Sequence, residues 1–330
     1  MRVLITGGAG FLGRRVISAL LAQGKLMDSD DNEREISRIC VADVAEPPQA
    51  LPDDPRLETV YGDFSEPGAA QRLLRDDTGV VFHLAAIVSG QAEQEFDLGM
   101  RINLDGTRRL LDACRELSQP PRFVFSSSVA VYGGDMPPVI QDTTPPVPQT
   151  SYGAQKAGSE LLVSDYSRKG FVDGRSLRLP TIIVRPGKPN AAASSFASSV
   201  LREPLQGEDV VCPVAAETGV WALSPRRVVD CFVRAARLPA SAWGTNRTLM
   251  LPGLTVTVAE MLKALRAVGG DAVAARVRFE PDPFIEQIVY GWPTRFDPRR
   301  ALDMGFVADN SMTEIIEAFV EDDLGGLIAS

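Results

Sequence analysis

The chain begins with an apolar run that leads directly into a glycine-rich stretch. After Arg-Val-Leu-Ile at positions 2–5, glycines stand at positions 7, 10 and 13, and helical periodicity continues to Gln23. This order predicts a buried strand, a tight turn and a helix. Because glycines let the backbone approach a pyrophosphate, whose charge the helix N-terminus favours, the turn is typical of a dinucleotide site. The residues predicted to line that site are Gly7, Gly10, Phe11, Leu12 and Gly13.

Predicted strands and helices alternate through the first half of the chain, which indicates an α/β fold with a doubly wound parallel sheet. After Pro180 a stretch rich in Pro, Ala and Ser ends this alternation, so we expect a smaller substrate lobe that interleaves with the main domain. The segments 220–236 and 248–251 look like returns to the main sheet. The predicted domains are 1–180 plus about 220–255 for the cofactor, and about 181–219 plus 256–330 for the substrate. The further strands are expected at 36–43, 57–61, 80–84, 122–126 and 176–179, and helices at 103–117 and 152–167.

The composition excludes several classes of protein. No apolar run approaches the roughly 20 residues that a membrane-spanning helix needs, and the strand-like start does not have the pattern of a secretion leader. The formal charge of −9 opposes binding to nucleic acid or anionic lipid. The four cysteines are widely spaced, without the pattern of a metal site or a disulfide framework. We therefore expect a cytoplasmic protein with no metal, nucleic-acid partner or membrane partner.

Asp43 ends the second predicted strand, where a carboxylate accepts hydrogen bonds from ribose hydroxyls and repels a 2′-phosphate. This position favours NAD over NADP as the cofactor. The acidic stretch 28–35 puts Asp43 farther from the glycines than usual, and the pair Arg14-Arg15 lies nearby, so NADP stays an alternative. Asp63 and Phe64 follow the next strand and are candidates for contact with adenine, although a solvated aspartate at a strand end is also typical.

Tyr152 and Lys156 are four residues apart, so on a helix they share one face. The pKa of a free tyrosine is about 10, and a nearby ammonium lowers it toward the range useful for proton transfer. The pair therefore predicts Tyr152 as the proton-transfer group and Lys156 as its electrostatic partner. The spacing by itself is also common among surface pairs, and that alternative stays open on spacing alone.

Five segments in a fixed order relate the chain to a known family: TGGAGFLG at 6–13, HLAA at 83–86, NLDGT at 103–107, FSSSVAVYG at 125–133 and SYGAQK at 151–156. With these the chain resembles the extended short-chain dehydrogenase/reductase family, strongly over about 1–180 and weakly at 296–306. The resemblance implies a Rossmann domain that binds NAD. It implies that Ser128 positions the substrate oxygen, that Tyr152 is the general acid/base, and that Lys156 contacts the nicotinamide ribose.

The same resemblance assigns roles to residues around the second motif. It implies that Leu84, Ala85, Ala86 and Asn103 line the cofactor or hold the active-site backbone, with plain packing of small residues as the alternative. His83, the only histidine, is interpreted as structural. Many family members dimerise through the helices that match 103–117 and 152–167, so we expect a homodimer.

The substrate is indicated by the segment PTIIVRPGKPN at 180–190, in which Thr181 stands where nucleotide-sugar epimerases carry an asparagine. The stretch LPTIIVRPGKPN at 179–190, followed by AAASSF at 191–196 and LREPLQGED at 201–209, is similar instead to a narrower branch of the family. This branch, the D-erythronate dehydrogenases, oxidises a four-carbon sugar acid at C2 to the 2-oxo acid. A small acid needs a cation, and Arg185 is predicted to bind its carboxylate, with a structural ion pair as the alternative. Residues that could bind the other hydroxyls are Ser89, Asn190, Ser194 and Ser195, although polar loops are rich in serine.

Two other functions stay open. A nucleotide-sugar 4-epimerase or dehydratase would retain its NAD through turnover and would release no NADH. A dinucleotide-sensing scaffold protein would turn over no hydroxy acid at all.

Overall fold

The computed structural model describes residues 1–47, 50–188 and 194–329, which divide into two compact units. The first unit comprises 1–128, 150–178 and 229–250, and the second comprises 129–149, 179–228 and 251–330. The chain therefore crosses from one unit to the other several times. The segments 129–149 and 220–228 were expected in the cofactor domain, but they lie in the second unit.

A seven-stranded sheet forms the centre of the first unit, in the order β13-β9-β7-β6-β1-β4-β5. The strand β1 lies between β4 and β6 and pairs with both in parallel. From β1 the chain builds the sheet outward first on one side and then on the other, which is the doubly wound Rossmann arrangement that the sequence predicts. The strands are β1 (Arg2–Thr6), β4 (Arg38–Asp43), β5 (Leu57–Tyr61), β6 (Thr78–His83), β7 (Arg122–Ser128), β9 (Asp173–Leu179) and β13 (Thr248–Met250).

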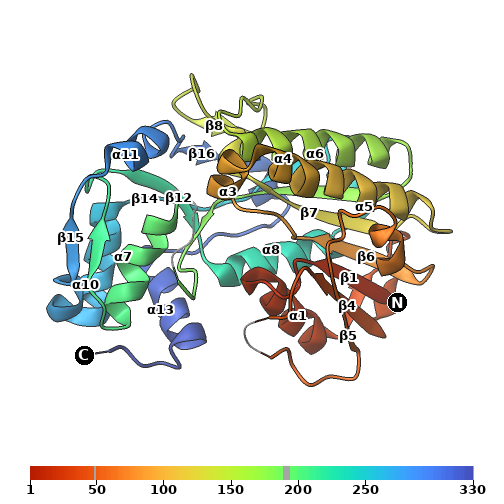
Figure 1. Cartoon of the computed structure of the whole chain (residues 1–330), viewed down its shortest axis with the longest axis horizontal. Coiled ribbons are helices and arrows are strands. Elements are labelled where there is room, and N and C mark those ends of the chain that lie inside the picture. Colours follow the sequence, from red (N-terminus) through yellow and green to blue (C-terminus); the bar gives the residue numbers. More distant parts are fainter. Residues whose placement is uncertain (48–49, 189–193, 330) are drawn as a thin grey trace. The chain divides into compact units, whose positions relative to one another are not determined.

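Helices cover both faces of this sheet, with α5 and α6 over one face and α1 over the other (Figure 1). All five residues of β1 are buried, as expected for a central strand enclosed on both sides. On the α5 and α6 face, Leu4 packs in a cluster with Phe123, Leu110 and Val163. The elements between the strands are α1 (Phe11–Gln23), the hairpin β2 (Lys25–Met27) and β3 (Glu33–Glu35), α2 (Ala69–Leu73), α3 (Ser89–Gln94), α4 (Phe96–Gly99), the π-helix η1 (Met100–Asp105), α5 (Gly106–Arg115), α6 (Ser151–Arg168) and α9 (Ala240–Trp243).

The second unit is built from small sheets and longer helices. A three-stranded sheet has the order β10-β12-β14, and β11 pairs with β15 and β8 with β16. The expectation that the segment beginning at Val220 returns to the main sheet is wrong, because β12 pairs with β10 and β14; only 248–250 joins the main sheet, as β13. The strands are β8 (Ile140–Gln141), β10 (Thr181–Ile182), β11 (Val210–Cys212), β12 (Gly219–Leu223), β14 (Leu254–Thr257), β15 (Val277–Phe279) and β16 (Phe296–Asp297).

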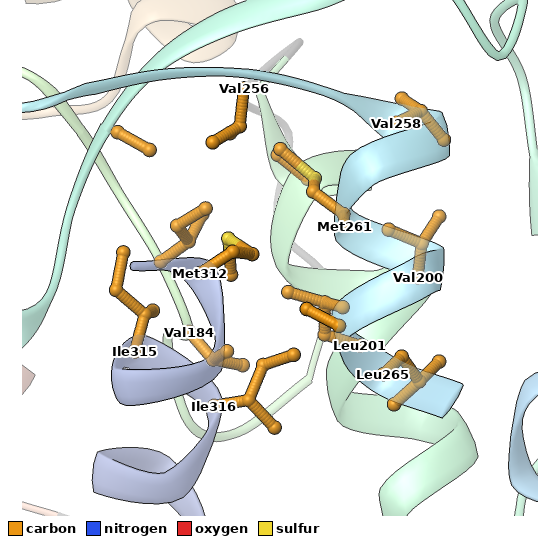
Figure 2. Packing of buried hydrophobic residues seen from close by; sticks show 14 of the residues in the cluster. Val184, Val200, Leu201, Val256, Val258, Met261, Leu265, Met312, Ile315 and Ile316 are labelled. Atoms are coloured by element: carbon orange, nitrogen blue, oxygen red, sulfur yellow. The ribbon is translucent and has the colours of Figure 1, made fainter. Parts of the chain in front are cut away.

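Three helices of the second unit bring their apolar faces together in one buried cluster (Figure 2). Leu201 comes from α7, and Met261 and Leu265, four residues apart, come from α10. On α13, Ile315 and Ile316 follow Met312 at the three- and four-residue spacings of a helix face. No helix in the described part of the chain is long and apolar enough to cross a membrane. The helices of this part are η2 (Val129–Val131), α7 (Ser195–Leu205), α8 (Pro225–Arg237), α10 (Val258–Ala274), α11 (Pro283–Val289), α12 (Arg299–Asp303) and α13 (Met312–Asp323), and α8 continues into the first unit.

Local sequence explains where two of these helices begin. The side chain of Thr257 accepts a hydrogen bond from the backbone of Glu260, whose carboxylate accepts one from the backbone of Thr257 in return. At α13, Ser311 accepts from the backbone of Glu314. Both are N-terminal caps of the Ser/Thr-x-x-Glu type.

Candidate active site

The glycine turn between β1 and α1 has a backbone that only glycine allows at two of its positions. Gly7 has φ of +70°, and a Cβ there would lie 2.7 Å from the backbone nitrogen of Ala85. A Cβ at Gly13 would collide with the carbonyl oxygen of Gly7. Gly10 precedes α1 without a side-chain cap among the described residues, and the first N–H groups of a helix in this position can donate to a ligand. The turn therefore fits the pyrophosphate of a dinucleotide.

The turn lies between β1 and β6, where the order in which the chain adds strands to the sheet reverses. The neighbouring strands β1 and β6 are followed by chain segments that leave on opposite sides, and their ends remain joined by hydrogen bonds. The backbone nitrogen of Leu84 donates to the carbonyl of Thr6 at 3.1 Å, and that of Ala85 donates to the Thr6 hydroxyl at 3.4 Å. Ala86 is exposed and the two residues before it are half-buried. A crevice at such a switch point is where open α/β sheets bind ligands.

Asp43 lies beside the glycine turn despite its distance in sequence. Its Oδ2 accepts a hydrogen bond from the backbone of Ala9 at 2.9 Å, and its Oδ1 accepts from the backbone of Val44 at 2.8 Å. The acidic stretch that separates it from the glycines is taken up by the β2–β3 hairpin and its turn. The insertion therefore leaves the end of β4 next to the turn, with an anchored carboxylate.

Asp63 and Phe64 are already engaged within the protein. Partial burial disfavours the charged form of Asp63, but hydrogen bonds from Ser65 and Arg101 hold the pKa of its carboxyl below the usual value. The ring of Phe64 is buried and packs edge-to-face on His83, with centroids 5.6 Å apart. The Phe64 side chain thus belongs to the core, and a contact with adenine would have to come from its backbone or from Asp63.

His83 is a neutral, buried residue that links strands to a helix. Its Nδ1 lies 2.7 Å from the hydroxyl of Thr6 and its Nε2 lies 2.9 Å from that of Thr107. Since the Thr107 hydroxyl donates to the carbonyl of Asn103, it accepts the Nε2 proton, so Nδ1 is the unprotonated nitrogen. Burial, together with the charge of Lys156, lowers the pKa of His83 to about 3. The arrangement agrees with the structural role expected from the sequence.

Asn103 lies in the π-helix η1 and connects the loop after β6 to α6. Its Oδ1 accepts from the backbone of Ile87 at 2.9 Å, and its Nδ2 donates to the side chain of Gln155 at 2.8 Å. Its carbonyl accepts from the hydroxyl of Ser159. Asn103 therefore ties the loop after β6 to α6. Gln155 was not identified from the sequence, because its partner lies 52 residues away and no local pattern marks it.

Lys156 is buried, so it is not the surface residue that its spacing from Tyr152 alone would allow. Its Nζ donates to the carbonyl of Ser126 at 2.8 Å, and it lies 4.7 Å from the ring centroid of Phe125 and 5.6 Å from that of Tyr152. Burial lowers the pKa of Lys156 to about 7, and the charge of Glu160 opposes this shift. The ammonium of Lys156 on α6 and the carbonyl of Ser126 on β7 thus meet in the interior of the first unit.

Ser128 is the last residue of β7 and is half-buried, like Tyr152 at the start of α6. Both belong to the first unit together with the glycine turn. Ser89 is the first residue of α3 and is also half-buried. The polar groups predicted for proton transfer and for the cofactor therefore come from one unit.

Arg185 belongs to the second unit, where its backbone is held on both sides. Its backbone nitrogen donates to Ser198, and Arg202 donates to its carbonyl at 2.7 Å. Its guanidinium donates to the hydroxyl of Ser194 at 3.2 Å. Ser195 begins α7. Asn190 lies outside the described residues.

Comparison with known proteins relates nearly the whole chain to oxidoreductases and epimerases. The model of the NAD dependent epimerase/dehydratase family matches residues 3–227. A D-erythronate dehydrogenase of Cupriavidus necator is 56% identical over 98% of both chains, and one of Haemophilus influenzae is 47% identical over 98% of this chain and all of its own. A crystal structure described as a nucleoside-diphosphate-sugar epimerase from Agrobacterium tumefaciens is 44% identical with a TM-score of 0.93, covering 99% of this chain and 95% of that one.

The neutral state of His83 predicts how stability changes with pH. The folded protein does not take up the proton that the unfolded chain takes up below about pH 6.5, so this stabilisation is present above that pH and is lost progressively toward pH 3. Lowering the pH from about 7.5 to about 5.5 should cost roughly 1.4 kcal/mol through this group. Urea unfolding of the wild type and of His83→Gln at both pH values checks this. Since the chain has one histidine, an equal pH dependence in the two proteins would contradict the assignment.

Proposed function

The chain belongs to the NAD dependent epimerase/dehydratase family, and we propose that it oxidises D-erythronate or a closely related small sugar acid at C2 to the 2-oxo acid. Its cofactor is NAD. The observation that carries the proposal is the buried ammonium of Lys156 beside the ring of Tyr152, in the unit that also holds the glycine turn. The substrate class rests on the two relatives named D-erythronate dehydrogenase, which match the chain over almost its full length.

The chain's own residues would supply the proton chemistry. Tyr152 in its ionised form accepts the proton of the C2 hydroxyl, while Ser128 donates a hydrogen bond that orients the same oxygen. The charge of Lys156 lowers the pKa of Tyr152, and this effect is strong because burial excludes water from the lysine. NAD, when bound, accepts a hydride from C2. The products balance as the 2-oxo acid, NADH and one proton.

Specific residues would hold the cofactor. The turn from Gly7 to Gly13, with Phe11 and Leu12 at the start of α1, would hold the pyrophosphate, and Asp43 the adenosine ribose. Residues of the loop after β6 and Lys156 would contact the nicotinamide side. Asp63 and the backbone of Phe64 are proposed for the adenine.

A direct assay tests the function. Purified protein would be incubated with NAD and with D-erythronate, other four- to six-carbon sugar acids or nucleotide sugars, and NADH would be followed by absorbance. We expect NADH to accumulate with a small sugar acid. The similarity to the structure described as a nucleoside-diphosphate-sugar epimerase supports the second candidate, an epimerase or dehydratase. Conversion of a nucleotide sugar without net NADH would favour that candidate and reject ours.

Replacing Tyr152 by phenylalanine tests the proton-transfer role. The variant should bind NAD almost as well as the wild type but turn over about a hundredfold more slowly, the usual scale for a lost general acid/base. Tyr166→Phe, on the same helix, is the matched control and should retain most activity. The measurements are NAD affinity by calorimetry and kcat. Near-normal turnover of the Tyr152 variant would reject the assignment.

Asp43→Ser tests the choice of cofactor. The carboxylate anchored beside the glycine turn would repel the 2′-phosphate of NADP, so removing its charge should reduce the preference for NAD and improve the use of NADP. The ratio of kcat/KM for the two cofactors measures this. A wild-type enzyme that already prefers NADP would contradict the role directly.

Arg185 is our proposed ligand for the substrate carboxylate. Its backbone is fixed by Ser198 and Arg202, and a guanidinium offers a bidentate contact that a single ammonium cannot match. Arg185→Ala should lose about 1.5 to 3 kcal/mol, roughly ten- to a hundredfold in kcat/KM, and Arg185→Lys should recover only part of this. NAD affinity should not change in either. Full activity of both variants toward the sugar acid would remove the role.

We also propose a homodimer formed through α5 and α6, as the family resemblance implies. The exposed face of α6 carries Leu161, whose side chain is 74% exposed in the single chain. Leu161→Arg should lower the molar mass in light scattering from that of a dimer toward that of a monomer. Leu327→Arg, at an equally exposed leucine of the second unit, is the control and should leave the mass unchanged. A wild type that is monomeric would contradict the dimer.

The cytoplasm is our proposed location. All four cysteines are buried and none forms a disulfide, which suits a reducing compartment.

A further inference from the structure

Glu160 is a buried carboxylate for which the proposed reaction has no use. It lies on α6 one turn after Lys156 and is 3% exposed. Two strands hold it in place. Arg178 of β9 donates from Nε to Oε1 at 2.9 Å and from Nη2 to Oε2 at 2.6 Å, and Ser127 of β7 donates its hydroxyl to Oε1. Three elements therefore fix the position of one charge.

The face of α6 that carries this carboxylate also carries the catalytic pair. Tyr152, Lys156 and Glu160 follow one another at four-residue intervals, so they lie along one side of the helix. Adjacent residues of β7 serve the two charges separately: the carbonyl of Ser126 accepts from Lys156, and the hydroxyl of Ser127 donates to Glu160. The carboxylate is thus held one helical turn from the ammonium by contacts that do not involve the ammonium.

The other groups around Lys156 offer it little negative charge. His83 of β6 is neutral, and β7 contributes a carbonyl and the ring of Phe125. Tyr152 is neutral until it ionises. Arg178 of β9 is cationic and is paired with Glu160. Among the described groups that face the ammonium, Glu160 is the fixed anion.

We propose that Glu160, held by Arg178 and Ser127, is a positioning residue that stabilises the protonated form of the catalytic Lys156 in its buried site. The role of Lys156 in catalysis rests on the proposed function. Burial lowers the pKa of this lysine to about 7 although the charge of Glu160 already opposes the shift, so without that carboxylate the amine would be mostly neutral at physiological pH. A neutral amine would not lower the pKa of Tyr152. The effect of Glu160 is exerted through space in a medium of low dielectric constant, so it needs no direct hydrogen bond to the lysine.

Titration of Lys156 itself tests this without any substrate. The chain has only five lysines, so 13Cε resonances of labelled lysine can be followed by NMR from pH 5 to 11, and Lys156→Met assigns the signal. In Glu160→Gln, which keeps the shape and one acceptor oxygen, the midpoint of Lys156 should fall by about one pH unit or more. In Glu160→Asp, which keeps the charge, it should stay closer to the wild-type value. Asp165→Asn, an exposed carboxylate on the same helix, should leave it unchanged.

A second variant covers the case in which Glu160→Gln does not fold because Arg178 is left unpaired. Glu160→Gln combined with Arg178→Met removes both charges, a change that buried ion pairs often tolerate. The Lys156 midpoint should again fall, but by less than in Glu160→Gln alone, because the loss of the Arg178 charge favours the ammonium. An unchanged midpoint in the folded variants would overturn the proposal, since a purely structural ion pair would affect stability but not the lysine.

The pH dependence of turnover separates this inference from the proposed function. If the protein oxidises a sugar acid, the alkaline limb of kcat should move to lower pH in Glu160→Gln, in step with the NMR midpoint. If it turns over no sugar acid, the NMR titration still decides whether Glu160 holds the charge of Lys156.

Discussion

The hydrogen bond between Thr6 and His83 is the contact on which the geometry of the first unit depends. It begins a chain of buried polar groups that continues from His83 through Thr107 to Asn103 and on to Gln155. Each group satisfies the next, so the loss of one would leave its neighbours buried without partners, at a cost of about 1–3 kcal/mol each. The chain joins the end of β1, where the glycine turn starts, to the helix that carries Tyr152 and Lys156. The glycine turn and α6 are therefore held by one network.

Because Lys156 is buried, its charge can act strongly on the neighbouring Tyr152. An ammonium in water would be screened and would affect a neighbouring tyrosine only weakly. Inside the protein the same charge acts strongly, but the protein must then stabilise it. The carbonyl of Ser126, the ring of Phe125 and the fixed carboxylate of Glu160 provide that stabilisation. Lys156 and the groups that stabilise its charge come from α6 and β7, which the fold places against each other.

Fold similarity alone does not decide the reaction. Relatives named D-erythronate dehydrogenase and a structure described as a nucleoside-diphosphate-sugar epimerase both match almost the entire chain. The first unit holds groups that would serve either chemistry, since both need NAD and a proton-transfer residue. The second unit has its own core of α7, α10 and α13 (Figure 2), so its surface residues can differ between relatives without disturbing the cofactor turn.

The sequence by itself determined the Rossmann sheet, the glycine turn and the Tyr152–Lys156 pair. Each of these can be predicted from local periodicity or from a spacing of a few residues. It also indicated Asp43 as a strand-end carboxylate, but only the structure shows it beside the turn, since the intervening residues fold into a separate hairpin. The pairing of β12 with β10 and β14, and the clamp of Arg178 on Glu160, join segments distant in sequence and carry no local signal. Above all, the tertiary structure decided that Lys156 is buried. A spacing of four residues defines a helix face, whereas the packing of that face against β7 defines its dielectric environment and hence the charge it can hold.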